Sequence, residues 1–161
     1  MRTPILLALL CLTTSAAAAE PPPLRIDVPV VLKEAKVVFN LDHHAFLGDQ
    51  PIGLEFMRLM TERLRADGTK ARIVAIFHGD GGYLALNDAT YATVRHWPSG
   101  NPYKGQIAAL MQAGAEIEIC GETMIMNRWG NDVLLPRIKV NTGANFRIVE
   151  LVQQGFVAIQ P

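Results

Sequence analysis

The sequence has 161 residues, a length typical of a single domain. Hydrophobic residues make up 50% and charged residues 19%, which allows a packed core and argues against an intrinsically disordered chain. The 15 basic residues balance the 15 acidic ones, so nothing indicates the basic surface that binds nucleic acid or anionic lipid, and we expect no nucleic-acid partner.

The N-terminal residues have the order of a secretory signal peptide. Arg2 supplies a positive start, residues 5–12 form an apolar run too short to span a bilayer, and residues 16–19 offer a small-residue cleavage site. We therefore expect residues 1–19 to be removed on export, which leaves a periplasmic chain that begins at Glu20 and no longer contacts the membrane. An uncleaved membrane anchor is the alternative.

Cysteine usage narrows the chemistry. Cys11 lies in the predicted signal peptide, so Cys120 is the only cysteine of the mature chain and no intramolecular disulfide can form. The absence of a C-x-x-C motif excludes a dithiol cycle within one chain. A single cysteine in an exported protein indicates either a reactive thiol or an intermolecular disulfide, and the alternative is a small buried hydrophobic residue.

Residues 20–34 contain three consecutive prolines and predict an extended lead-in, so the folded domain is expected over residues 35–161. A short apolar run at 36–41 predicts the first strand, and a polar break at 42–50 follows. Pro51 opens a predicted helix that Gly68 ends. The apolar stripe of this helix is expected at Ile52, Phe56, Leu59, Met60 and Leu64.

The middle of the chain predicts a second strand at 72–77, followed by a glycine-rich turn at 78–82. A helix is expected around 83–96 and a loop at 97–100. Asn101 and Pro102 have the residue types of a helix N-cap and first turn, for a helix that runs to Met111 and stops at Gly114.

The last third alternates in the same way. Residues 116–120 alternate polar and apolar side chains and predict a third strand. The elements expected after it are a short helix at 123–128, a strand at 138–141, a helix at 145–153 ended by Gly155, and a last strand at 156–159.

Strands that alternate with helices predict a single α/β domain: a mostly parallel sheet of about five strands with helices on both faces. In such sheets ligands bind at the carboxyl ends of the strands. Three polar breaks fall at that edge, at residues 42–44, 78–81 and 120–121. We therefore expect the functional site there.

Cys120 is the candidate catalytic residue. If Gly121 allows a sharp turn, the amides of Glu122 and Thr123 at the start of the following helix point back at the sulfur and favour the thiolate. The carboxylate of Glu122 opposes this effect. His78 and Thr123 are candidates for nearby polar support.

Other chemistries are poorly represented, so no organic cofactor and no metal are expected. The histidines show no zinc-binding spacing, and adjacent histidines on a strand point to opposite faces. The histidines are His43, His44, His78 and His96. The turn at 79–82 lacks the phosphate-binding patterns, and no G-x-S-x-G nucleophile motif is present.

Three segments resemble the DsrE/DsrF-like family of small α/β proteins. They are the strand at 37–40, the strand and turn at 73–81, and residues 116–123, with Arg128 and the closing segment 154–156 downstream. The resemblance extends over residues 35–160. It implies a parallel-sheet core, homotrimers or homohexamers, and transfer of persulfide sulfur between proteins by a cysteine at the end of the third strand. In this chain that cysteine is Cys120.

The leading hypothesis is a periplasmic DsrE-like protein, a possible sulfurtransferase, that carries or transfers sulfane sulfur on Cys120. Its partners would be a protein thiol or a small sulfane-sulfur donor or acceptor. One alternative is a non-enzymatic binding or assembly module in which Cys120 is structural. Another is a histidine-based metal binder that uses His78 or His43.

Overall fold

The computed structural model describes residues 23–161. The predicted signal peptide, residues 1–19, and residues 20–22 of the predicted lead-in lie outside the described residues. The chain divides into a first unit, of which only residues 23–30 are described and contain no helix or strand, and a compact second unit, Val31–Pro161. Among residues 23–161, no helix has both the length and the apolar character needed to cross a membrane.

A five-stranded sheet forms the centre of the second unit, in the order β6-β5-β4-β1-β7 with every neighbouring pair parallel. All five predicted strands are present, with ends shifted by at most two residues. Their bounds are β1 Glu34–Leu41, β4 Lys70–Phe77, β5 Glu116–Cys120, β6 Lys139–Asn141 and β7 Val157–Ile159. The predicted parallel α/β fold is therefore confirmed.

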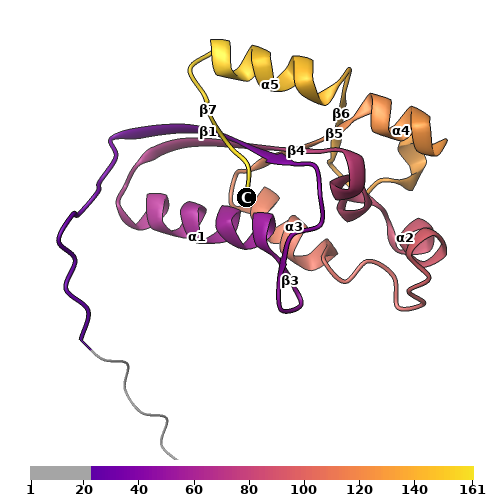
Figure 1. Ribbon diagram of the computed structural model, residues 1–161, viewed down its shortest axis with the longest axis horizontal. Helices are drawn as coiled ribbons and strands as arrows, with labels where there is room; N and C mark the ends of the chain where they lie inside the picture. Colours follow the sequence, from indigo (N-terminus) through magenta and orange to yellow (C-terminus); the bar gives the residue numbers. More distant parts are fainter. Residues whose placement is uncertain (1–22) are drawn as a thin grey trace, which may run out of the picture. The chain divides into compact units, whose positions relative to one another are not determined.

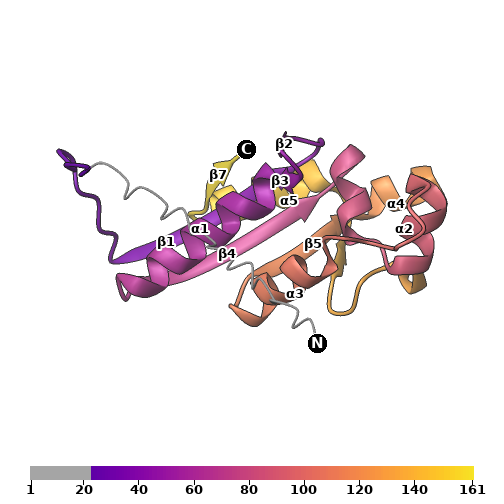
Figure 2. The same ribbon diagram turned by 90° about the horizontal axis from the view of Figure 1, so that it is seen from below.

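Helices cover both faces of this sheet. Helices α1 (Ile52–Ala66) and α3 (Lys104–Gln112) lie on one face and α5 (Ala144–Gln153) lies on the other (Figure 1). Figure 2 shows α1 and α3 from below, in front of the strands. Because side chains alternate along a strand, Phe39 packs in the core under α1 and α3, whereas Val38 packs in the core under α5.

Shorter elements connect these layers. They are the hairpin strands β2 (Phe46–Leu47) and β3 (Gln50–Pro51), the 3₁₀ helices η1 (Gly79–Ala85) and η2 (Asn131–Val133), and the helices α2 (Asp88–Arg95) and α4 (Gly121–Asn127). The hairpin spans the end of the predicted polar break at 42–50 and includes Pro51, which is the N-cap of α1 rather than its first residue. The helix predicted around 83–96 is divided, because residues 79–85 form the 3₁₀ helix and α2 begins only at Asp88.

Two predictions of local detail were wrong. In α1, Phe56 and Leu59 are exposed, and the buried residues are Gly53, Leu54, Met57 and Leu64. Gly53 lies at the contact with β1, where a Cβ would lie 2.1 Å from Leu41 Cδ2. Asn101 is not a helix cap: it is buried, and its side-chain amide donates hydrogen bonds to the carbonyls of Leu84 and Leu86.

The connections identify one special point at the sheet edge. Between β5 and β6, Leu134, Leu135 and Ile138 pack in the same core as α1 and α3. The connection that leaves β6 passes instead through α5 on the opposite face. In open parallel sheets, ligands bind where the connections from neighbouring strands leave to opposite faces. In this sheet that point lies between Cys120 and Asn141, the last residues of β5 and β6.

Candidate functional site

Cys120 is the last residue of β5, and its side chain faces α5. It is 3% exposed and belongs to a small apolar core. The other members of that core are Val38, Val74, Ile76, Ala144, Leu151 and Phe156. The backbone N–H of Ala144, the first residue of α5, donates a hydrogen bond to Cys120 Sγ at 3.3 Å. The sulfur therefore lies against the positive end of a ten-residue helix.

The donor differs from the predicted one. The amides of Glu122 and Thr123 were expected at the sulfur, but Cys120 is the N-cap of α4 without a side-chain capping hydrogen bond. The reason is that the side chain of Cys120 is directed away from α4 and under α5. The turn at Thr142–Gly143, which follows β6, brings the Ala144 amide to the sulfur instead.

Gly121 supports the site by its lack of a side chain. A Cβ at this position would lie 2.8 Å from the carbonyl oxygen of Asn141 and 3.5 Å from that of Thr142. Only glycine allows the start of α4 and the end of β6 to approach this closely. This approach sets the position of the turn that carries Ala144.

His78 follows β4 directly and is half-buried. The register pairs Phe77 with Ile119, so continuing it by one residue places His78 beside Cys120 on the neighbouring strand. His78 Nε2 lies 2.6 Å from Oδ1 of Asn40, and because an amide oxygen only accepts, Nε2 is the donor. Burial lowers the pKa of His78, against the opposing charge of Asp42, so the neutral ring is favoured.

Thr123 is buried in the first turn of α4, and its hydroxyl accepts a hydrogen bond from the Gly79 amide at 3.0 Å. It therefore ties α4 to the turn that follows His78. Within residues 23–161, no hydrogen bond joins the sulfur of Cys120 to His78 or Thr123. Both residues lie at the predicted edge, but His78 bonds to Asn40 and Thr123 bonds to Gly79.

The remaining histidines do not assemble a metal site. His43 pairs with Asp42, and His44 stacks between the rings of Phe46 and Tyr83. Among residues 23–161, no three side chains of His, Cys, Asp or Glu are grouped closely enough to hold a metal ion. The alternative of a histidine-based metal binder therefore has no geometric support in this part of the chain.

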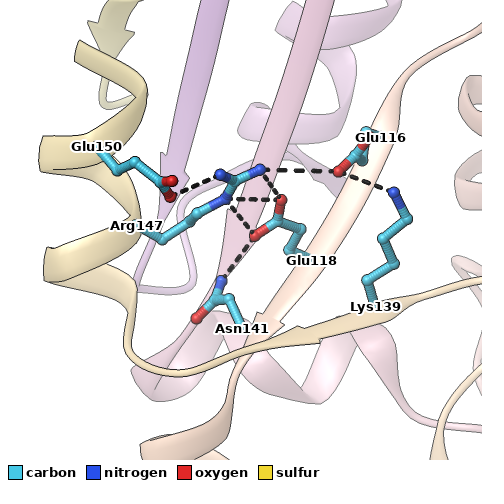
Figure 3. A network of polar contacts seen from close by, with 6 residues as sticks. All are labelled: Glu116, Glu118, Lys139, Asn141, Arg147 and Glu150. Carbon is cyan, nitrogen blue, oxygen red and sulfur yellow. Dashed lines mark hydrogen bonds and ion pairs between the residues drawn. The ribbon is translucent and has the colours of Figure 1, made fainter. Parts of the chain in front are cut away.

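A partly buried ion pair joins Glu118 on β5 to Arg147 on α5 and was not predicted from the sequence (Figure 3). Glu118, on β5, is 3% exposed, and Arg147, on α5, donates to both of its carboxylate oxygens, the shortest contact being 2.7 Å. Asn141 donates to the same carboxylate at 3.0 Å. Hydrogen bonding to Glu118 is the largest influence that raises the pKa of Arg147 above its ordinary value.

The alternation of β5 is the signal that could have identified this pair. Glu116, Glu118 and Cys120 share one face of the strand. Two glutamates on one face predict that this face is exposed to solvent. In the structure α5 covers that face, so Glu118 needs a buried partner. Glu116 lies nearer the solvent and pairs with Lys139 at 3.0 Å.

A family model and one solved structure agree with this fold. A model of the DsrE/DsrF-like family matches residues 36–161. The protein of unknown function MTH1491 from Methanobacterium thermoautotrophicum has a similar structure, with a TM-score of 0.62 and 21% sequence identity, over 79% of this chain and 99% of that one. The ychN protein from E. coli aligns with a TM-score of 0.48 and 14% identity, over 78% of this chain and 99% of its own.

No curated protein sequence matches this chain. The similarity to MTH1491 shows a shared fold and nothing about its reaction. The family model covers nearly all of the second unit, including β5, Cys120 and the start of α4. The chain belongs to the DsrE/DsrF-like family.

Proposed function

We propose that this chain is an exported DsrE-family protein that carries or transfers sulfane sulfur as a persulfide on Cys120. The observation that carries the proposal is the 3.3 Å hydrogen bond from the Ala144 amide to Cys120 Sγ. A sulfur anion is stabilised by an N–H donor and by the positive end of a helix. The position of this sulfur at the switch point of the sheet, together with family membership, supports the same conclusion.

The proposed reaction is a thiol exchange that needs no cofactor. The Cys120 thiolate attacks the outer sulfur of a donor persulfide, the donor S–S bond breaks, and the donor leaves as a thiolate. Cys120 then holds the outer sulfur as its own persulfide. An acceptor thiolate attacks that sulfur and regenerates the Cys120 thiolate, so no net oxidation occurs. The donor and acceptor are protein thiols or small sulfane-sulfur compounds.

Access to the sulfur is part of the proposal. At 3% exposure, Cys120 cannot meet a donor until its cover moves. The first turn of α5 is the part of the cover that also bonds to the sulfur, through Ala144. A movement of this turn exposes the thiol and leaves the sheet unchanged.

Intact mass spectrometry tests the proposal directly. The chain that begins at Glu20 is incubated with polysulfide or thiosulfate, and the expected product is heavier by about 32 Da, the mass of one sulfur atom. Cys120→Ser should abolish the adduct, and a reducing thiol should remove it. An unmodified wild-type protein, or an adduct that persists in Cys120→Ser, would contradict the proposal.

The burial of Cys120 favours a second candidate function, a non-enzymatic assembly module in which this side chain is core. In that case thiol reagents label the native protein only as fast as it unfolds globally. Cys120→Ala would lower the free energy of unfolding without changing the capture of any partner. Labelling faster than global unfolding argues for the sulfur carrier instead.

We also propose that copies of the chain associate as a homotrimer or homohexamer. Support comes from exposed apolar side chains on α4 and α5, namely Ile125, Met126, Phe146, Val149 and Val152. Light scattering should give three or six times the mass of the mature chain, and Phe146→Glu should reduce it. Leu59→Glu, at an exposed position on α1, is the matched control and should leave the mass unchanged.

Export to the periplasm is proposed from the N-terminal sequence. The full-length chain, expressed in a Gram-negative host, should appear in the periplasmic fraction with Glu20 as its first residue. N-terminal sequencing checks this. A product that keeps Met1 and remains in the cytoplasm would exclude a cleavable signal peptide.

A further inference from the structure

The partly buried ion pair between Glu118 and Arg147 has no role in the proposed sulfur transfer itself. Glu118 precedes Cys120 by two residues, and both side chains point toward α5. Arg147 follows Ala144 by three residues, and its backbone N–H donates to the Gly143 carbonyl in the first turn of α5. The ion pair and the Ala144–Cys120 hydrogen bond therefore join the same strand to the same helical turn.

Two neighbouring contacts between β5 and α5 fix the orientation of the helix start, whereas a single contact would allow it to rotate. The contact between the Ala144 amide and the sulfur is a single hydrogen bond of 3.3 Å. Arg147 adds bonds from two of its nitrogens to Glu118, at 2.7 to 3.0 Å. A guanidinium that grips a carboxylate through two nitrogens also fixes the plane of the pair. The position of the Ala144 amide on the sulfur therefore depends on the ion pair between Arg147 and Glu118.

Stability alone does not account for a charged pair at this point. Burying the Glu118 carboxylate carries a desolvation cost that its attraction to Arg147 must offset, and apolar side chains of similar volume often stabilise a protein as well as such a pair or better. The rest of this core is apolar. The ion pair between Arg147 and Glu118 has a defined geometry, so it fixes the position of the start of α5 more closely than apolar packing does.

The other charged groups at Arg147 are more exposed. Glu150, on α5, pairs with it at 2.8 Å, and Glu116, on β5, lies 3.8 Å away and is bound mainly by Lys139. Glu118 is therefore the only buried carboxylate among the charged partners that the described chain offers Arg147.

We propose that Arg147 is a positioning residue for Cys120: through Glu118 it holds the first turn of α5 on β5, which keeps the Ala144 amide on the sulfur and closes the thiol to solvent. This inference rests on the proposed sulfur-carrying role of Cys120. Release of the pair is then the movement that opens the site.

Alkylation of Cys120 by iodoacetamide, measured in the native protein across a pH range, tests this proposal. The main variant is the double change E118Q/R147Q, which removes both charges together and leaves neither one buried alone. We expect roughly tenfold faster alkylation at high pH, from local opening. The rate profile should also move to higher pH, because the sulfur anion loses its N–H donor.

Three further variants separate positioning from stability. Glu150→Gln removes the exposed partner of the same guanidinium and should behave like the wild type. Arg147→Lys keeps the charge and should restore part of both effects. Leu54→Ala weakens the core under α1, on the other face of the sheet, and should leave the pH profile unchanged.

The result that overturns the proposal is a wild-type alkylation rate and pH profile in E118Q/R147Q. Faster alkylation with an unchanged profile overturns it as well, because the pair would then cover the sulfur without placing the amide. Sulfur loading is measured separately by mass. Loss of loading in the wild type would refute the proposed function, whereas the alkylation result would still report on positioning.

Discussion

The close approach at Gly121 offers the sharpest test of how the site is built. In Gly121→Ala the new Cβ would lie 2.8 Å from the Asn141 carbonyl oxygen. The obstacle is backbone, so a side-chain rotation cannot relieve it, and the end of β6 must move by about half an ångström to restore normal contact. Overpacking of this kind costs about 1–3 kcal/mol. The higher helix propensity of alanine offsets up to about 1 kcal/mol of this cost.

We therefore expect Gly121→Ala to lower the free energy of unfolding by about 1–2 kcal/mol. For a domain of this size the midpoint of thermal unfolding should fall by about 3–8 °C. Because Ala144 follows the displaced strand end by three residues, its amide should leave the sulfur, and Cys120 should be alkylated faster. Urea denaturation and native alkylation measure the two effects.

Gly105→Ala is the matched control. Gly105 lies in α3, and a Cβ there would meet nothing within 4 Å. The same substitution should therefore raise the free energy of unfolding by about 0.5–1 kcal/mol. If Gly121→Ala proved as stable as Gly105→Ala, the packing of Gly121 against Asn141 would not be a constraint and the reasoning would be wrong.

Three further predictions concern the same edge. Thr123→Val should cost about 0.5–1.5 kcal/mol, because the Gly79 amide loses its hydrogen-bond acceptor, whereas Thr123→Ser should retain most of the stability in urea denaturation. Burial lowers the pKa of His78 from its ordinary value of 6.5, so at a pH near 6.5 the unfolded chain binds more protons than the folded chain. The free energy of unfolding should therefore decrease as the pH falls from 7.5 to 5.5, and His78→Gln should reduce that slope; an equal slope would contradict it. His44 has its pKa lowered by burial as well, so His44→Gln should act in the same direction.

Most of the fold could be predicted because its signals are local. The run at 36–41 and the alternation at 116–120 identify strands without knowledge of their neighbours, and both are strands in the structure. Side-chain facing was harder, since it depends on which surface the helix meets. The buried face of α1 includes Gly53, which packs against Leu41, a residue twelve positions earlier in the chain.

The candidate site could be predicted in place but not in detail. Cys120, Gly121, His78 and Thr123 all lie at the carboxyl edge of the sheet, as a parallel arrangement requires. Their hydrogen bonds could not be inferred, because the partners come from distant segments. The amide on the sulfur belongs to Ala144, 24 residues away, rather than to the adjacent helix.

The amino-acid sequence by itself determined the order of the five sheet strands along the chain, the parallel α/β class and a cysteine at a strand end, because these depend on periodicity and local residue types. The family followed from the resemblance of three segments and from the family model. Only the tertiary structure decided that α5 covers the polar face of β5. That covering buries Glu118, pairs it with Arg147 and brings a helix start to Cys120. The physical reason is that burial and pairing depend on two surfaces in contact. The residues of β5 alone do not specify which helix covers them or which side chains that helix contributes.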